Sequence, residues 1–494
     1  MEIIAQVSTS GWAFSWQTTL TGTLFLIDLV IKALAIGVIP NGRKPSTAMA
    51  WLILILAVPF FGFLIFLVLG RIDVGRRRTA RQREADASIR EITERLRPDI
   101  PEEPAYLASV ATLGYRLGAL PLLAGNRVEL EPDYTAGIAR MTEAVSQAER
   151  TVEVEFYISA WDRVTAPFFE ALVAATERGV TVRFLFDHLG SRGIPGYEEF
   201  EKRLAGTRIQ WRAMLPIRPL KGEIRRPDLR NHRKILVVDG QVAFMGSQNL
   251  IEPGYNKPKN HAAGREWVEL VARIEGSAVR ALRAVFAKDW FGETGERIAP
   301  EVARARPTPA GDTYVQVLPS GPGYHSENNL RVFSALIYSA QRRVSLTSPY
   351  FVPDEPLLYA VTSAAQRGLD VELFVSEEGD QFMVHHAQRS YYQALLDAGV
   401  TIWLYPAPAV LHSKHFSIDD DVAVIGSSNM DMRSFALNYE VSSVLTGPGI
   451  VADFRRVEDA YRAISRRLTR EEWVARPRRA KYVDNAMRLT AALQ

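Results

Sequence analysis

The sequence predicts an α/β protein made of two similar halves, preceded by a hairpin of two membrane-spanning helices. Three observations lead to this prediction. Two long apolar stretches lie within the first 75 residues, strand-like and helix-like patterns alternate beyond about residue 130, and a long segment of the chain occurs twice. Alternation of buried strands with helices is typical of layered α/β folds. A length of 494 residues leaves room for more than one domain.

The apolar stretches cover residues 20–39 and 48–69. Each approaches the ~20 residues that a helix needs to cross the apolar core of a bilayer. The chain starts MEIIAQVSTSGW, without lysine or arginine, and a second apolar stretch follows at once, which argues against a cleaved signal peptide. Asp28 and Lys32 have i,i+4 spacing and can pair in lipid. We therefore predict a membrane hairpin over residues 1–75; two buried core helices are the alternative.

A basic connector follows at residues 76–125. The loop between the apolar stretches contains Arg43 and Lys44, whereas more arginines follow the second stretch. Because the larger basic excess stays on the cytoplasmic side, we expect the body of the protein there, with a chain that crosses the membrane twice. The arginines suit anionic headgroups or serve as an ordinary flank of a membrane span. The whole chain has no cysteine, which excludes disulfides and thiol chemistry, and its net charge is only +3.

The segment ALVAATERGVTVRFLFD (171–187) aligns with AVTSAAQRGLDVELFVS (360–376). Both are typical of a helix that ends at a glycine, Gly179 or Gly368, and is followed by a buried strand. The same order of elements continues in both halves over a length too great for a solenoid repeat, which indicates a duplication. We place the halves at residues 126–300 and 301–494.

Each half contains the pattern His-x-Lys-x4-Asp. It occurs in NHRKILVVDG (231–240) and in LHSKHFSIDD (411–420), and Gly-Ser-x-Asn follows at the same spacing in both. An Asp-Gly pair between apolar runs predicts a tight hairpin. Such a hairpin places His232 opposite Ser247, with Asn249 just beyond. The second copy consists of His412, Lys414, Asp419, Ser427 and Asn429.

An imidazole surrounded by ammonium and amide donors suits a phosphoryl group, whose charge the donors stabilise. Of two such imidazoles, one can attack phosphorus and the other can transfer protons. The motifs lack metal-ligand spacing, so no metal is expected. An imidazole also needs an acceptor on its other nitrogen, and Glu266 and Glu440 lie downstream in strand-like runs. Asp239 and Asp419 occupy turns and fit a structural role more readily than a chemical one.

The segments HRKILVVDGQVAFMGSQN and HSKHFSIDDDVAVIGSSN resemble the paired HKD motifs of the phospholipase D superfamily. The apolar hairpin, the arginine-rich connector and the two halves resemble the bacterial cardiolipin synthases of that superfamily. SPYFVPDEPL (348–357) and NMDMRSFALNYE (429–440) are similar to the same group. The resemblance covers nearly the whole chain. It implies two pseudo-symmetric α/β/α sandwich halves around one active site, a phosphohistidine intermediate and no cofactor.

The resemblance also implies roles for single residues. His232 would be the nucleophile and His412 the general acid and base, an assignment that the symmetry of the sequence does not make. The catalytic set would comprise His232, Lys234, Asp239, His412, Lys414 and Asp419. The lysines, Asn249 and Asn429 would bind phosphoryl oxygens, with Ser247 and Ser427 beside them, and Glu266 and Glu440 would orient the histidines.

The expected reaction transfers a phosphatidyl group from one phosphatidylglycerol to another and releases glycerol. The expected partners are phosphatidylglycerol and other anionic phospholipids, and the expected location is the bacterial inner membrane. The alternatives are a phospholipase D that yields phosphatidic acid, and a synthase that uses phosphatidylethanolamine or CDP-diacylglycerol. The membrane hairpin and the small net charge argue against a nuclease. Intact His, Lys and Asn sets argue against an inactive membrane scaffold.

Overall fold

The computed structural model describes residues 16–41, 43, 45–70, 74–94, 98–218, 226–298, 309–324 and 327–491. The predicted boundary at residue 300 lies outside this part of the chain. The chain divides into two units, Met1–Asp73 and Val74–Gln494.

The first unit consists of three helices: α1 (Trp16–Val38), α2 (Pro45–Ala57) and α3 (Pro59–Leu69). Helix α1 includes a 20-residue apolar segment, Thr19–Val38, which is long enough to cross a membrane. The Lys32 ammonium lies 2.8 Å from the Asp28 carboxylate, so the expected pair forms.

The predicted single helix over residues 48–69 is wrong. Helix α2 ends at Ala57 and α3 begins at Pro59, so two helices of 13 and 11 residues replace it. Proline has no N–H to donate and its ring clashes with the preceding turn, which ends α2 there. Each piece is shorter than the ~20 residues of a transmembrane helix. By length, α1 is therefore the one candidate span among the described helices.

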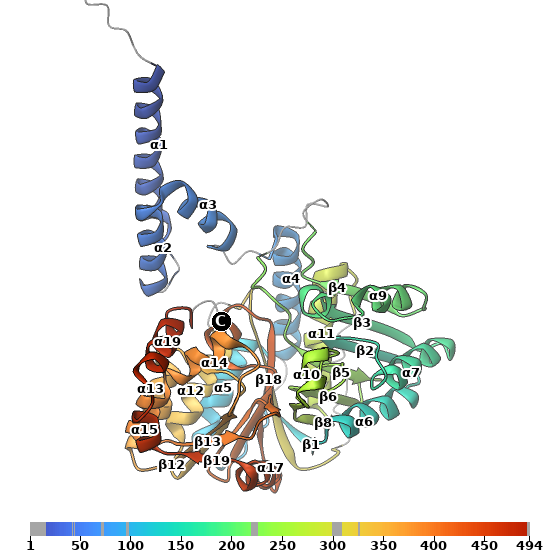
Figure 1. Ribbon diagram of the computed structural model, residues 1–494. Coiled ribbons are helices and arrows are strands. Elements are labelled where there is room, and N and C mark those ends of the chain that lie inside the picture. Colours follow the sequence, from blue (N-terminus) through green and yellow to red (C-terminus); the bar gives the residue numbers. More distant parts are fainter. Residues whose placement is uncertain are drawn as a thin grey trace, which may run out of the picture. The chain divides into compact units, whose positions relative to one another are not determined.

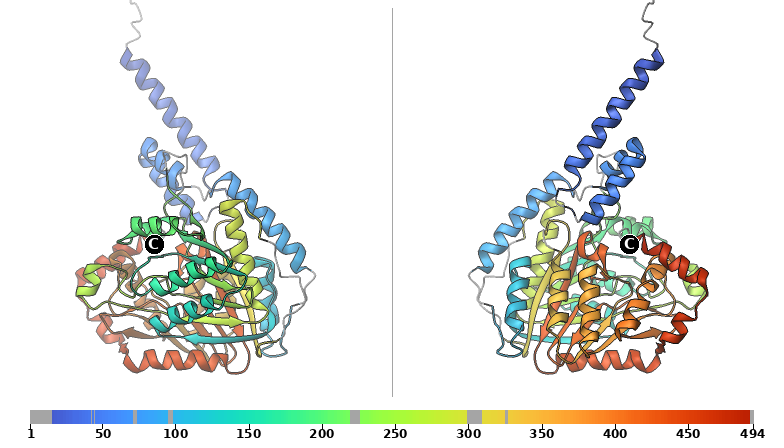
Figure 2. Two further views of the ribbon diagram at one scale, coloured as in Figure 1. Left: turned by 90° about the vertical axis from the view of Figure 1, so that its right-hand side faces the viewer. Right: turned by 90° about the vertical axis from the view of Figure 1, so that its left-hand side faces the viewer.

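The second unit begins with the two helices of the basic connector, α4 (Arg76–Thr93) and α5 (Leu107–Gly118). Helix α4 packs against α11, and α5 packs against α12 and β9 (Figures 1 and 2). The first half contains β1 (Leu123–Glu131), α6 (Tyr134–Ser146), β2 (Thr151–Phe156), α7 (Ala166–Glu177), β3 (Thr181–Asp187), α8 (His188–Arg192), α9 (Tyr197–Ala205), β4 (Gln210–Met214), β5 (Lys234–Val238), β6 (Val242–Gly246), α10 (Pro258–Ala262), β7 (Trp267–Val268), β8 (Val271–Glu275) and α11 (Ala278–Thr294).

The second half contains β9 (Thr313–Ser320), α12 (Asn328–Ser339), β10 (Arg343–Thr347), β11 (Phe351–Val352), α13 (Glu355–Gln366), β12 (Asp370–Ser376), α14 (Phe382–Arg389), α15 (Tyr392–Ala398), β13 (Thr401–Tyr405), β14 (Val410–Leu411), β15 (His415–Ile418), β16 (Val422–Gly426), β17 (Met430–Asp431), α16 (Met432–Ala436), β18 (Glu440–Thr446), α17 (Ile450–Ile464), β19 (Arg466–Leu468), α18 (Arg470–Val474) and α19 (Arg478–Arg488).

The strand order confirms the predicted duplication. The first half has the order β4-β3-β2-β5-β6-β8-β1, and the second half has the matching order β13-β12-β10-β15-β16-β18-β9, with β19 added at its edge. Strands β1 and β9 pair antiparallel and join both halves into one sheet. The helix–glycine–strand repeat corresponds to α7–β3 and α13–β12, and both Gly179 and Gly368 have φ of +89°.

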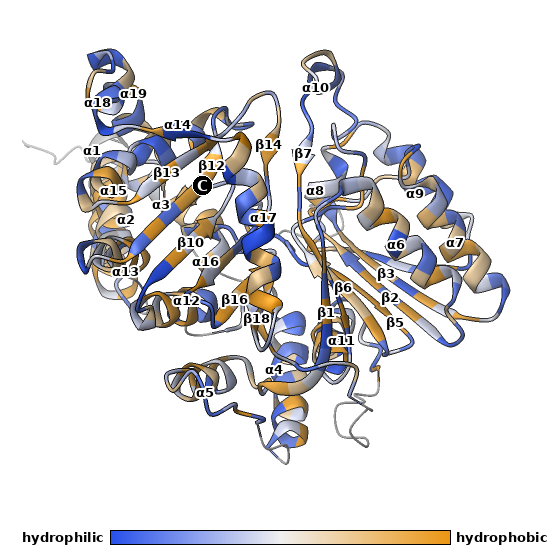
Figure 3. Ribbon diagram, turned by 90° about the horizontal axis from the view of Figure 1, so that it is seen from below, coloured by the Kyte–Doolittle hydropathy of each residue, from blue (hydrophilic) through white to orange (hydrophobic). Residues whose placement is uncertain are grey.

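Helices cover both faces of the sheet, as the predicted α/β/α sandwich requires (Figure 3). Helices α6 and α7 pack on the first half with Met141, Phe168 and Leu172 in the core, and α12 and α13 pack on the second half. Helices α11 and α17 share one core on the opposite face, built from residues of both halves such as Leu282 and Phe454. This shared core aligns the halves along their junction.

Candidate active site

Each histidine-bearing segment pairs with a segment of the other half. The backbone N–H of His232 donates to the carbonyl of Tyr439 (2.8 Å), and that of His412 donates to the carbonyl of Val268 (2.8 Å). Strands β7 and β14 continue the second contact as a parallel pair. The two motifs therefore meet at the junction of the halves.

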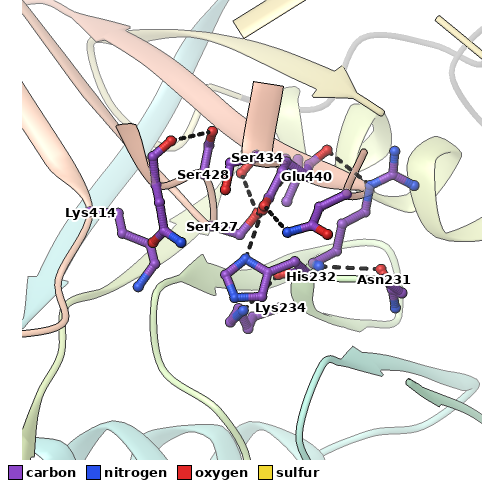
Figure 4. Close-up of polar contacts among 12 residues, drawn as sticks. Asn231, His232, Lys234, Lys414, Ser427, Ser428, Ser434 and Glu440 are labelled. Atoms are coloured by element: carbon purple, nitrogen blue, oxygen red, sulfur yellow. Dashed lines mark hydrogen bonds and ion pairs between the residues drawn. The ribbon is translucent and has the colours of Figure 1, made fainter. Parts of the chain in front are cut away.

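A glutamate of the opposite half contacts Nδ1 of each imidazole. Glu440 Oε2 lies 3.0 Å from His232 Nδ1 (Figure 4), and Glu269 Oε1 lies 2.7 Å from His412 Nδ1. All four residues are buried. A carboxylate at Nδ1 holds the proton there and leaves the Nε2 lone pair free. Each ring can thus present Nε2 to a substrate as a nucleophile or base.

The expectation that Glu266 orients a histidine is wrong, and Glu269 lies in that place. The Glu266 side chain is exposed, and its carbonyl accepts a hydrogen bond from the N–H of Val410 (2.8 Å). The sequence contained a usable signal. Glu269 and Glu440 both lie seven residues before the glycine that follows β8 or β18, Gly276 or Gly447. The spacing counted forward from the histidine does not identify the matching glutamate, because the segment around α10 makes the first half longer at this point.

The predicted hairpin register is shifted by one residue. Strands β5 and β6 pair Val238 with Val242, so three residues form the turn instead of two. Strands β15 and β16 behave alike, with Ile418 opposite Val422. The turn aspartates have φ of +53° at Asp239 and +49° at Asp419, which accommodates the longer loop. Ser247 and Ser427 therefore do not lie directly opposite the histidines.

The serines of the Gly-Ser-x-Asn segments lie behind the imidazoles. Ser427 Oγ donates to Glu440 Oε2 at 2.5 Å, whereas Ser247 Oγ accepts from the N–H of Leu270 at 3.0 Å. Asn249 is buried, and its amide donates to the Tyr255 hydroxyl at 2.8 Å.

Asn429 occupies the matching position of the second half. It is buried, and its side chain hydrogen-bonds to Asp431. Burial raises the pKa of Asp431 to about 6. Sequence reasoning did not single out this carboxyl, which follows the motif by two residues.

The motif lysines are buried beside the histidines. Nζ of Lys234 and Nζ of Lys414 each donate to the carbonyl of the motif histidine two residues before, at 2.6 Å. Lys414 Nζ also lies 3.1 Å from Nδ1 and 3.2 Å from Nε2 of His412. Burial lowers the pKa of Lys234 to about 7 and that of Lys414 to about 8. Two cations that water solvates poorly form a favourable place for a phosphodiester anion.

The grouping of Asp239 and Asp419 with the catalytic residues is wrong. The Asp239 carboxylate accepts three backbone N–H groups at 2.8 Å, from residues 149–151. The Asp419 carboxylate accepts those of residues 341–343 at 2.7 to 2.9 Å. Both lie in the turns, at the end of each hairpin away from the histidines. They fix the start of β2 and of β10, which is the structural role that their turn positions favour.

Replacing Asp419 with asparagine is expected to reduce stability and to spare catalysis. The substitution replaces one carboxylate oxygen, which accepts from backbone N–H groups, with an NH₂ group, which donates. This loss costs about 2–3 kcal/mol of unfolding free energy. Thermal denaturation and the turnover number of the folded fraction measure the two effects. The control is Asp420→Asn, because the Asp420 side chain is 76% exposed. A turnover number reduced more than about tenfold at unchanged stability would contradict the structural role.

The environments of the two imidazoles differ in charge. Burial, followed by the cations Lys234 and Lys414, lowers the pKa of His232 well below its usual range. Burial also lowers the pKa of His412, but the Glu269 carboxylate opposes that effect. His232 is thus the stronger candidate for a neutral ring, and His412 is better placed to carry a proton. Within the described residues, no three His, Asp or Glu side chains form a metal-binding group.

The family model described as cardiolipin synthase, PLD-like domain, matches residues 141–290 and 333–460, which include both motifs. The chain belongs to this cardiolipin synthase family. A second model, described as phospholipase D-nuclease N-terminal, matches residues 24–71. The family and the apolar helix α1 together indicate a membrane-associated protein.

Relatives in the cardiolipin synthase family match over most of their length. Cardiolipin synthase A of Pectobacterium carotovorum is 32% identical over 92% of this chain and 94% of the relative. Cardiolipin synthase A of Yersinia pseudotuberculosis is 33% identical over 91% of this chain and 93% of the relative. The solved phosphatidylserine synthase of Haemophilus influenzae has a TM-score of 0.57 at 13% identity and covers 80% of this chain and 100% of its own. That structure has the same fold.

In this member of the cardiolipin synthase family, aromatic rings adjoin both imidazoles. Tyr157 packs edge-on against His232, with ring centroids 4.9 Å apart, and Tyr350 packs edge-on against His412 at 6.2 Å. The Tyr350 hydroxyl donates to the Asp380 carboxylate at 2.9 Å. Sequence reasoning did not single out either tyrosine, although both follow β2 or β10, the strands that adjoin the hairpins.

Proposed function

We propose that the chain is a cardiolipin synthase that transfers a phosphatidyl group from one phosphatidylglycerol to another through a phosphohistidine at His232. One observation carries the proposal. Two buried imidazoles, each with Nδ1 on a glutamate of the other half, lie beside two buried lysines at the junction of the halves. That arrangement supplies a nucleophile, a proton carrier and cations for a phosphodiester.

In the first step, His232 Nε2 attacks the phosphorus of one phosphatidylglycerol. The bond from phosphorus to the headgroup glycerol oxygen breaks, and His412 gives its proton to that oxygen. Glycerol leaves, and the phosphatidyl group remains on His232. Lys234 and Lys414 stabilise the charge that develops on the phosphoryl oxygens, and Asn249 and Asn429 lie beside them.

In the second step, a free headgroup hydroxyl of another phosphatidylglycerol attacks the phosphohistidine. His412, now neutral, accepts the proton of this hydroxyl as the new phosphorus–oxygen bond forms. The bond from phosphorus to His232 Nε2 breaks, which restores the neutral nucleophile. The lower pKa of His232 and the carboxylate support of the His412 proton favour this division of roles.

Phosphatidylglycerol and other anionic lipids are the proposed substrates, and the bacterial inner membrane is the proposed location. The catalytic unit would lie on the cytoplasmic side, since arginines such as Arg76 and Arg77 follow the apolar segments. One membrane crossing by α1 fits the helix lengths; a second would need α2 and α3 to act together.

Lipid mass spectrometry on the purified chain in phosphatidylglycerol liposomes tests the proposal. Cardiolipin with an equal amount of glycerol is the expected product. Phosphatidic acid as the main product would make water the acceptor and the chain a phospholipase D. Formation of cardiolipin only after phosphatidylethanolamine or CDP-diacylglycerol is added would show that the added lipid is the co-substrate.

The dependence of kcat/KM on pH is expected to be bell-shaped, with its maximum at about pH 7. Burial raises the pKa of Glu440 to about 7, so acidification protonates the carboxylate that supports His232. The lysine ammonium groups, with pKa values lowered to about 7 and 8, are lost as the pH rises.

Initial rates of cardiolipin formation from about pH 5 to pH 10 measure this profile. Lys234 has the lower pKa of the two lysines and therefore sets the alkaline limb. Lys234→Arg keeps its charge over that range, so it should move the alkaline limb to higher pH. A rate that does not change between about pH 6 and pH 9 would contradict the titration of these groups.

A further inference from the structure

The two imidazoles have equivalent direct hydrogen-bond partners, but the residues packed behind those partners differ. We call these residues the supporting layer. The residue before each orienting glutamate accepts the backbone N–H of a histidine: Tyr439 does so for His232, and Val268 does so for His412. Tyr439 is fully buried. Its hydroxyl accepts a hydrogen bond from the Gln82 side chain at 2.7 Å, across 357 residues of sequence. Valine offers no such hydroxyl, so a contact of this kind exists on the His232 side alone.

Two guanidinium groups also lie on the Tyr439 ring. Arg78 lies 5.0 Å from the ring centroid and Arg233 lies 5.4 Å from it. A cation on the face of an aromatic ring is attractive, and more so where water is excluded. Both arginines are buried. Tyr439 is therefore enclosed by Gln82 and Arg78 of α4 and by the residue that follows His232.

Arg233 extends the supporting layer to the backbone of Glu440, the orienting glutamate. Its Nε donates to the backbone carbonyl of Glu440 at 3.0 Å, and its guanidinium pairs with Asp289 of α11. The residue at the same place in the second motif is Ser413, whose hydroxyl accepts a hydrogen bond from Tyr461 of α17 at 3.2 Å. The Arg233 side chain thus connects the backbone carbonyl of Glu440 to α11.

The glutamates themselves differ in the same sense. Glu440 accepts from Ser427 at 2.5 Å in addition to its contact with His232. Glu269 Oε2 has no hydrogen-bond partner within the described part of the chain. The His232 side is therefore the more completely bonded of the two.

Helix α4 is itself bound firmly to the catalytic unit. Arg78 forms an ion pair with Glu293, and Asp86 lies 2.5 Å from the ammonium of Lys288. Figures 1 and 2 show α4 alongside α11. Gln82 and Arg78 of α4 reach Tyr439, whereas Ser88 on the same helix is exposed. Helix α4 thus has buried residues that contact the supporting layer and an exposed residue that does not, which can serve as a control.

We propose that α4 positions the nucleophile: Gln82 and Tyr439 hold the Glu440–His232 pair in its attacking geometry, and His412 has no such support. The assignment of His232 as the attacking group rests on the proposed function. Attack on phosphorus requires one fixed direction of the Nε2 lone pair, because small misplacements of a reacting atom are costly. A proton carrier must serve two oxygens in turn, so a less restrained His412 suits that role. Gln82 and Tyr439 touch no substrate and act as positioning residues.

An activated phosphodiester isolates the attack by His232. A phosphatidyl ester with a p-nitrophenol leaving group needs no acid, so the burst of p-nitrophenol in a His412→Ala background measures this attack alone. Loss of an outer partner of a reacting group typically costs 10- to 100-fold. We expect Gln82→Leu to slow the burst about 10-fold and Tyr439→Leu about 100-fold, with the ester concentration at half-maximal burst rate changed less than about twofold.

Ser88→Ala, at an exposed position of the same helix, is the control and should leave the burst rate unchanged. Tyr439→Phe keeps the ring and loses only the hydroxyl contact, so it should slow the burst about 10-fold, as Gln82→Leu does, and not 100-fold. A merely structural role predicts that rate and melting temperature fall together and that substrate affinity falls as well. If Tyr439→Leu does not fold, Gln82→Leu tests the same hydroxyl contact while the Tyr439 ring stays in place.

Burst rates within twofold of the parent for both Gln82→Leu and Tyr439→Leu would overturn the inference. Failure of the proposed function has a different signature. In that case the unsubstituted chain makes no cardiolipin from phosphatidylglycerol, whereas the burst from the activated ester still reports whether α4 positions His232.

Discussion

Replacing His232 with alanine is expected to abolish lipid turnover and the covalent intermediate together. Without this imidazole the site lacks the atom assigned to form the bond to phosphorus, and loss of a nucleophile typically costs about 10⁴- to 10⁶-fold in rate. The measurement combines lipid mass spectrometry with detection of an acid-labile phosphoprotein after brief exposure to substrate. Lys234 and Lys414 remain in the variant, so substrate binding should persist while the chemistry is lost.

His412→Ala provides the contrasting result. With an activated ester, His232 still attacks and the phosphatidyl-enzyme accumulates, because no base removes the proton of the second alcohol. Turnover of phosphatidylglycerol is expected to fall about 10²- to 10⁴-fold, which is typical of losing a general acid or base. If His412→Ala eliminated the intermediate and His232→Ala preserved it, the two roles would have to be exchanged. If neither variant altered turnover, the site itself would be wrong.

Regular patterns in the sequence were sufficient to predict the architecture. The duplication is confirmed by two identical strand orders, because the helix–glycine–strand pattern is local and occurs in both halves. His232, Lys234, His412 and Lys414 were also found by sequence alone, and the structure brings them together at the junction. The histidine and lysine of each motif are two residues apart, at or just before the start of β5 or β15, so their proximity follows from their spacing in the sequence.

The errors have local causes that periodicity does not capture. The break before Pro59 divides an apolar run whose composition is uniform, so hydropathy alone predicts one helix. A three-residue turn instead of a two-residue turn shifts every pair in the hairpin by one position. Asp239 was grouped with the catalytic residues through its motif, although its carboxylate binds backbone N–H groups.

The remaining features arise from contacts between distant segments. Each orienting glutamate belongs to the half opposite its histidine, and sequence spacing within one half contains no information on that exchange. The contact between Gln82 and Tyr439 is a stronger example, because it joins the connector to the second half. A connector rich in arginine is typical of a membrane flank, yet Arg78 is buried against Glu293. Tertiary structure was needed to separate the arginines that face solvent from those that bind the protein.

The crossed pairing of histidines and glutamates leads to a second large expected effect. Glu269→Gln replaces the carboxylate 2.7 Å from His412 Nδ1 with an amide of nearly the same shape. The amide can present its N–H to the ring, which favours the wrong tautomer, and it does not stabilise the imidazolium. A comparable substitution in a serine protease triad costs about 10⁴-fold. We expect a fall of about 10²- to 10⁴-fold in kcat, with little change in KM.

Glu266→Gln is the matched control, since it makes the same chemical change three residues earlier in the same segment. Its side chain is exposed and its contact with the second half is through the backbone carbonyl, so cardiolipin formation should stay within about twofold of the parent. Initial rates at saturating and limiting phosphatidylglycerol separate kcat from KM for both variants. Because Glu269 supports the proton of His412, its loss should act in the acid and base steps. The burst from an ester with a good leaving group should therefore survive in Glu269→Gln. Equal losses in the two variants, or a greater loss in Glu266→Gln, would show that the carboxylate beside His412 is not the group that orients it.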